Sequence, residues 1–154
     1  MLRRMRFVVV LSALVALAVA GGGFALAPDA ARKDGLPRYV DGYAKWPKVN
    51  RAPIRGGSAA HQGTKNVFAS KRRRGGRFPV GTIVVKTATP PGKKWLSLVA
   101  TMRRIKATSN GGWRWEEFTR TSPSRRFTKV GFPESGCAAC HAQASARDYV
   151  FTRR

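Results

Sequence analysis

Close to its C-terminus the chain carries the run Cys137-Ala138-Ala139-Cys140-His141. This is the Cys-x-x-Cys-His pattern that attaches a c-type haem, because two thiols at this spacing can each add to one vinyl group of the same porphyrin. The histidine that follows supplies an imidazole as an axial ligand of the iron. The motif therefore predicts one covalently bound haem c, with Cys137 and Cys140 as its tethers and His141 as the metal ligand.

Other uses of two cysteines explain the motif less well. A redox dithiol sits early in a βαβ pattern, which is not seen in this sequence. A structural zinc site requires four ligands, and His61 is the only histidine left to complete a set with Cys137, Cys140 and His141. A disulfide would leave His141 without a role. Zinc and a disulfide remain the alternatives to haem.

Residues 1–27 have the pattern of a secretory signal peptide. Three arginines precede an uncharged apolar run, which ends in a small-x-small cleavage site at residues 25–27. An uncut membrane anchor is the alternative, because the run is long enough to span a bilayer. The glycines and alanines at the end of the run favour cleavage. Both interpretations export the rest of the chain, a single haem domain at residues 28–154, and we expect it in the bacterial periplasm, where c-type haem is attached.

The charge of the chain limits its partners. The sequence has 154 residues, which fits one domain, and its 30 lysines and arginines against 7 acids give a net charge of +23. Such a charge suits an anionic partner, nucleic acid among them. The basic residues are spread along the chain, which makes us expect anionic lipids, acidic proteins or anionic small molecules rather than nucleic acid.

The apolar pattern after the leader predicts an α+β fold, mainly an antiparallel β-sheet with a few helices. Residues 37–49 carry apolar side chains at helical spacing, and residues 136–149 are expected to form the haem-binding helix. A hairpin turn is predicted at residues 109–112, and residues 121–130 are expected to be irregular. β-Branched runs and alternation predict four strands, at residues 64–70, 82–86, 95–105 and 112–118.

This order of elements excludes two familiar haem folds. The small electron-transfer cytochromes c carry the motif near the N-terminus and a methionine ligand far downstream. Here only 13 residues follow His141, and none is methionine or histidine. The cytochromes c′ have a C-terminal motif on a four-helix bundle, whereas the middle of this chain has the pattern of strands.

Several segments resemble the cytochrome P-460 family, which also contains the β-sheet cytochromes c′-beta. The matching segments are WPKVN at residues 46–50, FPVGTIVVK at 78–86, GGWRW at 111–115, the CAACH motif at 137–141 and DYVFT at 148–152. The resemblance implies a mostly antiparallel β fold, often a homodimer. It also implies a five-coordinate haem whose open side faces small nitrogen ligands or substrates such as hydroxylamine and nitric oxide.

The resemblance also assigns roles to single residues. In the hydroxylamine-oxidising members a lysine is joined covalently to the porphyrin, and its place in the pattern falls on Lys86. The nitric-oxide-binding c′-beta members lack this cross-link. Lys65 falls near a distal arginine of the family. His61 lies in a loop rich in glycine, from where it could act on the distal side.

One departure from the family pattern concerns a distal carboxylate, which the oxidising members use as a proton acceptor. Residues 95–106 hold no acid, and Met102 falls near that place. A methionine there could cap the iron or bind it. Glu116 and Glu117 are the nearest acids in sequence, and alternation points at least one of them outward.

Three functions are compatible with these residues. The first is an enzyme that oxidises hydroxylamine or a related nitrogen species, with Lys86, His61 and Lys65 as candidate catalytic groups. The second is a cytochrome that binds nitric oxide without turnover, which the missing carboxylate favours. The third is electron transfer by a six-coordinate iron, with Met102 or His61 as sixth ligand. The basic surface would suit a soluble acidic redox partner.

Overall fold

The computed structural model describes residues 31–56, 61–106 and 111–152. The predicted leader at residues 1–27 and the first two residues, 109–110, of the predicted turn at residues 109–112 lie outside this description. Among the described residues no helix is both long enough and apolar enough to cross a membrane.

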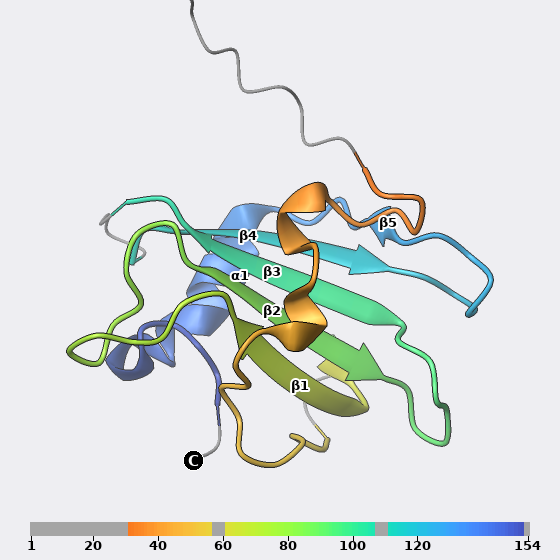
Figure 1. Cartoon of the computed structure of the whole chain (residues 1–154), viewed down its shortest axis with the longest axis horizontal. Helices are drawn as coiled ribbons and strands as arrows, with labels where there is room; N and C mark the ends of the chain where they lie inside the picture. Colours follow the sequence, from red (N-terminus) through yellow and green to blue (C-terminus); the bar gives the residue numbers. More distant parts are fainter. Residues whose placement is uncertain (1–30, 57–60, 107–110, 153–154) are drawn as a thin grey trace, which may run out of the picture.

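The centre of the protein is an antiparallel sheet whose five strands lie side by side in the order of the sequence (Figure 1). The strands are β1 (Thr64–Ala69), β2 (Ile83–Thr89), β3 (Leu98–Arg104), β4 (Trp113–Thr119) and β5 (Thr128–Lys129). Each strand from β2 onward pairs with the strand before it in sequence. This order is possible because antiparallel neighbours can be joined by short connections. The α+β fold expected from the sequence is confirmed.

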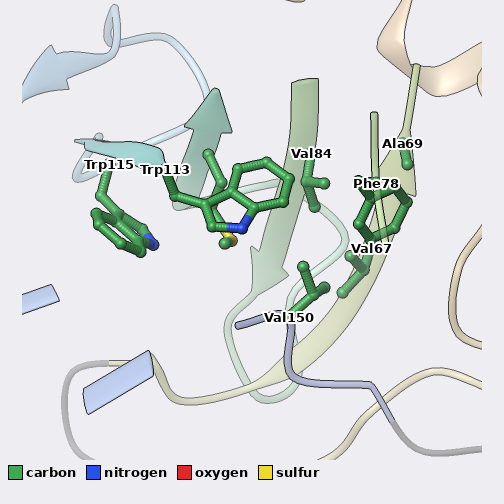
Figure 2. Packing of buried hydrophobic residues seen from close by; sticks show 8 residues of the cluster. Val67, Ala69, Phe78, Val84, Trp113, Trp115 and Val150 are labelled. Carbon is green, nitrogen blue, oxygen red and sulfur yellow. The ribbon is translucent and has the colours of Figure 1, made fainter. Parts of the chain in front are cut away.

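The sheet has a layer on each face (Figure 1). One face packs against the helix α1 (Glu134–Ala142) and the C-terminal tail, and we call it the α1 face. Its apolar cluster, drawn in Figure 2, consists of buried side chains from four strands, the loop before β2 and the tail. The members are Val67, Ala69, Phe78, Val84, Met102, Trp113, Trp115 and Val150.

The opposite face packs against the N-terminal segment, which crosses in front of the sheet in Figure 1. Val85, Val99 and Phe118 point to this side because side chains alternate along a strand. They pack against Leu36 and Val40 of the segment. Both faces of the central strands are therefore covered, and polar side chains on these strands lie next to packed layers and not in open solvent.

The prediction of a helix at residues 37–49 is wrong. Two single 3₁₀ turns take its place, η1 (Arg38–Val40) and η2 (Tyr43–Lys45). Asp41 is extended and Gly42 has a φ of 70° between them, so a continuous helix cannot pass through. The haem-binding helix is also shorter than predicted, because α1 ends at Ala142 and only a 3₁₀ turn, η4 (Ser145–Arg147), follows it.

The four predicted strands are all present, with shifted ends. β2 continues to Thr89, three residues beyond its predicted end, and β3 begins at Leu98 rather than at residue 95. The segment at residues 121–130 is irregular as predicted except for the two residues of β5. β5 pairs with the last residues of β4, and a strand of only two residues is too short to give a local pattern.

Candidate functional site

The helix α1 carries all three residues of the Cys-x-x-Cys-His motif on the α1 face of the sheet. Pro133 precedes the helix, and the Glu134 carboxylate at its start accepts the backbone N–H of Trp115 at 3.0 Å. This bond joins the beginning of α1 to β4. Cys137 and Cys140 are both free thiols, the first half-buried and the second exposed, and burial raises the pKa of the Cys137 thiol.

The imidazole of His141 is held in one orientation. Its Nδ1 lies 2.6 Å from the carbonyl oxygen of Tyr149, so Nδ1–H donates and Nε2 keeps its lone pair. Burial lowers the pKa of His141 to about 4, although the bond to Tyr149 opposes this shift. The rings of Trp115 and Phe151 flank the imidazole at 5.9 and 5.1 Å between centroids. A neutral, oriented imidazole of this kind is ready to bind a metal.

The carbonyl of Tyr149 is positioned by an unusual turn in the tail. Asp148 and Tyr149 have φ values of 55° and 64°, which are uncommon for residues other than glycine. The buried Asp148 carboxylate stabilises the turn, since it accepts a guanidinium N–H of Arg104 at 2.6 Å and the backbone N–H of Phe78 at 2.7 Å. Gly111 lies under the Tyr149 ring, where a Cβ atom would come within 2.5 Å.

Replacing Asp148 with alanine is expected to lower the free energy of unfolding by about 3–5 kcal/mol, because it leaves Arg104 as an uncompensated buried charge. Urea unfolding of the holoprotein measures the change. Asp41→Ala is the control, since its pair with Arg32 is exposed and an exposed pair contributes at most about 1 kcal/mol. Equal losses in the two variants would contradict the role given to Asp148.

Two cavities adjoin His141. The larger, of about 180 Å³, is lined by both thiols, His141, Trp115, Phe132 and Glu117 among others. The smaller, of about 30 Å³, lies between His141 and the sheet, against Lys86, Met102 and Val150. Two thiols, a free imidazole nitrogen and a mostly apolar wall on one side of the sheet form a donor set that fits a c-type haem.

Three polar side chains meet on the α1 face beside these cavities. Lys86 on β2 and Glu117 on β4 are both opposite Ala100 of the strand between them, so only a methyl group separates them in that row. His61 bridges the gap. Its Nδ1 lies 2.9 Å from the Lys86 ammonium and its Nε2 lies 2.7 Å from the Glu117 carboxylate.

The two residues at the ends of this row, Lys86 and Glu117, decide which nitrogen of His61 donates and which accepts. The Lys86 ammonium can only donate and the ionised Glu117 carboxylate can only accept, so His61 accepts at Nδ1 and donates from Nε2. Burial lowers the pKa of Lys86 to about 8, and the negative charge of Glu117 opposes that shift. The row can therefore pass a proton between an amine and a carboxylate through one imidazole.

The structure gives the other predicted residues different surroundings. Lys65 is buried, and its ammonium donates to the carbonyls of Gly56, His61 and Gly63. These hydrogen bonds fix the position of the loop that carries His61. Met102 is buried in the apolar cluster of the α1 face and also lines the smaller cavity.

Glu117 is an acid of the site whose role the sequence pattern alone does not predict. No acid lies on β3, but β4 carries Glu117 on the α1 face and Glu116 on the opposite face. There Glu116 accepts hydrogen bonds from Tyr39 at 2.6 Å and Lys129 at 2.5 Å. The signal was present in the sequence, since the alternation that pairs Trp113 with Trp115 also places Glu117 beside them.

The chain resembles a known protein family over most of its described length. The family model described as Cytochrome P460 matches residues 40–152. This range includes every residue of the site, from His61 to the turn after α1. A search of curated proteins finds no match.

Proposed function

The chain belongs to the cytochrome P460 family, and from that premise we propose that it oxidises hydroxylamine or a related small nitrogen species at one covalently bound haem c. As a member of this family it is a haem-binding cytochrome. The observation that carries the finer proposal is the row of Lys86, His61 and Glu117, which supplies a proton acceptor beside the haem-attachment motif.

The residues that would hold the haem are those of α1. Cys137 and Cys140 would bind it through thioethers, and His141 Nε2 would bind its iron, with Nδ1–H directed to Tyr149. Bound haem would supply an iron with an open coordination position and a store for electrons. The predicted leader at residues 1–27 agrees with attachment outside the cytoplasm.

The chain's own residues would then bind the substrate and remove its protons. Hydroxylamine must lose protons as it is oxidised, and the Glu117 carboxylate can accept one directly or through His61. Lys86 orients His61 by its bond to Nδ1. Trp115 and Met102 give the site apolar walls, which exclude water and strengthen the interactions of the charged groups.

The two alternative functions, binding of nitric oxide and electron transfer by a six-coordinate iron, do not explain the row of Lys86, His61 and Glu117. A cytochrome that only binds nitric oxide needs no proton acceptor, so the Glu117–His61 bond would have no role. A six-coordinate electron carrier needs a free sixth ligand. Both ring nitrogens of His61 are engaged in hydrogen bonds, and Met102 is packed in the apolar cluster.

Hydroxylamine turnover by the purified holoprotein, combined with its optical and paramagnetic spectra, tests the proposal. A high-spin ferric haem and steady oxidation are the expected results. A low-spin ferric haem would identify the electron carrier instead. A high-spin haem that binds nitric oxide but leaves hydroxylamine unchanged would identify the gas-binding cytochrome.

The cross-link predicted at Lys86 has its own test. We expect the peptide that contains Lys86 to retain the mass of haem after proteolysis, and Lys86→Arg to shift the ferrous Soret band to shorter wavelength, because the porphyrin loses its nitrogen substituent. Mass spectrometry and the ferrous spectrum measure the two effects. An unmodified Lys86 peptide and an unchanged band would show that Lys86 serves only in the hydrogen-bonded row.

A further inference from the structure

A cluster of exposed cations lies at one end of the sheet, in the connection between β1 and β2. We call residues 71–77 the basic hairpin; its exposed cations are Lys71, Arg72, Arg74 and Arg77. Two backbone hydrogen bonds, of 2.8 and 3.1 Å, join Arg74 and Arg77 across the turn, and the Lys71 ammonium donates to the carbonyl of Val80 at 3.2 Å. The cations are thus presented on an ordered turn.

The basic hairpin forms one side of an open cavity of about 290 Å³. Lys48, which is exposed, lies on its other side, so four cations line the cavity: Lys48, Lys71, Arg72 and Arg73. The apolar floor includes Val49 and Phe78, and none of the lining residues is acidic. A concave surface lined by charges of one sign concentrates its potential and attracts anionic partners.

Among the described residues, five cations of this surface have no acidic partner, unlike the cations elsewhere in the protein that pair with carboxylates. Within the described part of the chain, Lys48, Lys71, Arg72, Arg74 and Arg77 form no ion pair. By contrast, Arg32 pairs with Asp34 and Asp41, and Lys129 with Glu116. The positive potential at the basic hairpin is therefore not offset locally.

The basic hairpin is connected to the tail that follows α1. The Arg73 guanidinium donates to the carbonyl of Arg147 at 2.9 Å and lies 4.7 Å from the ring centroid of Phe78. The backbone N–H of Phe78 donates to the Asp148 carboxylate at 2.7 Å. Two contacts thus join the cationic surface to the turn that positions Tyr149.

The same turn reaches the axial histidine. Tyr149 follows Asp148 directly, and its carbonyl lies 2.6 Å from His141 Nδ1. A short run of covalent and hydrogen bonds therefore leads from the basic hairpin to the predicted iron ligand. Electron transfer between proteins weakens steeply with distance, so a surface joined to the iron ligand by few bonds is a suitable place for a redox partner to dock.

We propose that the basic hairpin is the docking surface for an acidic redox protein, which takes electrons from the haem through the tail at Asp148 and Tyr149. Each encounter oxidises the ferrous haem by a single electron and reduces the partner by the same electron, and no bond is made or broken. This step rests on the proposed function only in taking the haem as the electron donor. Carboxylates of the partner would face the cations of the hairpin and Lys48.

Oxidation of the ferrous holoprotein by ferricyanide, a small trianionic oxidant, tests the surface in stopped-flow experiments. The double variant Arg72→Glu/Arg74→Glu is expected to react roughly tenfold more slowly at low ionic strength, and salt should remove the difference. Lys93→Glu/Lys94→Glu is the matched control. It changes the net charge equally, in the exposed turn between β2 and β3 at the opposite end of the sheet, and we expect less than about a twofold effect.

Two further measurements do not depend on electron transfer rates. Hexacyanochromate, a paramagnetic anion, should broaden the amide NMR signals of the basic hairpin selectively in the native holoprotein. Poly-glutamate should slow ferricyanide oxidation of the native and control proteins but not of the hairpin variant. Equal rates in the two charge variants, or broadening spread over all basic segments, would overturn the proposal. Because no nitrogen substrate is present, this outcome is separate from failure of hydroxylamine oxidation.

Discussion

Replacement of both Cys137 and Cys140 by serine is expected to remove nearly all haem that survives denaturation. Each thiol would form one thioether to the porphyrin, and serine cannot form this bond. The haem stain on a denaturing gel and the pyridine haemochrome spectrum measure the loss. Both residues lie on α1 away from the strand interior, so the sheet should still form.

A single cysteine variant and the addition of Lys86→Arg to the double variant make this test decisive. Cys137→Ser alone should retain haem through the remaining thioether at Cys140. If the double variant still keeps haem on the gel, adding Lys86→Arg should release it, because Lys86 is the only other predicted covalent tether. A triple variant that retains denaturation-resistant haem would contradict the attachment assigned to these residues, as would zinc in the native protein.

Glu117→Gln is expected to lower the turnover number for hydroxylamine by about 10²–10⁴-fold, the usual contribution of a positioned general base. Glutamine keeps the size of the side chain and can still accept a hydrogen bond from His61 Nε2. It cannot accept a proton at neutral pH. Steady-state turnover, measured together with nitric oxide affinity, should show loss of oxidation and retention of ligand binding.

Glu116→Gln is the matched control, because the neighbouring carboxylate points to the opposite face and bonds with Tyr39 and Lys129. Its turnover should stay within about threefold of the native protein, and its main effect should be a loss of at most about 1 kcal/mol in stability from the ion pair with the exposed Lys129. If the two variants lose turnover equally, Glu117 has no specific part in proton transfer. His61→Ala should resemble Glu117→Gln if the proton travels through the imidazole.

The strands illustrate what local pattern can predict. Runs of β-branched residues and strict alternation located β1 to β4, since both signals arise from the pleat itself. The failure at residues 37–49 has an equally local cause. Apolar side chains at helical spacing are found there, but Gly42 in the left-handed region interrupts the backbone, and two short turns bury the same side chains.

The polar row shows what local pattern cannot predict. Lys86, His61 and Glu117 come from two strands and a loop, and they meet because β3 lies between β2 and β4 with Ala100 in register. No spacing in the sequence encodes that register. Alternation from Trp115 gives the face of Glu117, but it does not give the partner of Glu117.

The sequence by itself determined the family resemblance and the strand-rich body, and it predicts the haem-attachment residues, because each of these depends on neighbours in the chain. Only the tertiary structure decided which polar groups share the space beside His141, how Tyr149 orients its imidazole, and that Lys65 holds a loop. These depend on strand register and on the left-handed turn at Asp148, which are stabilised by contacts between residues far apart in the chain.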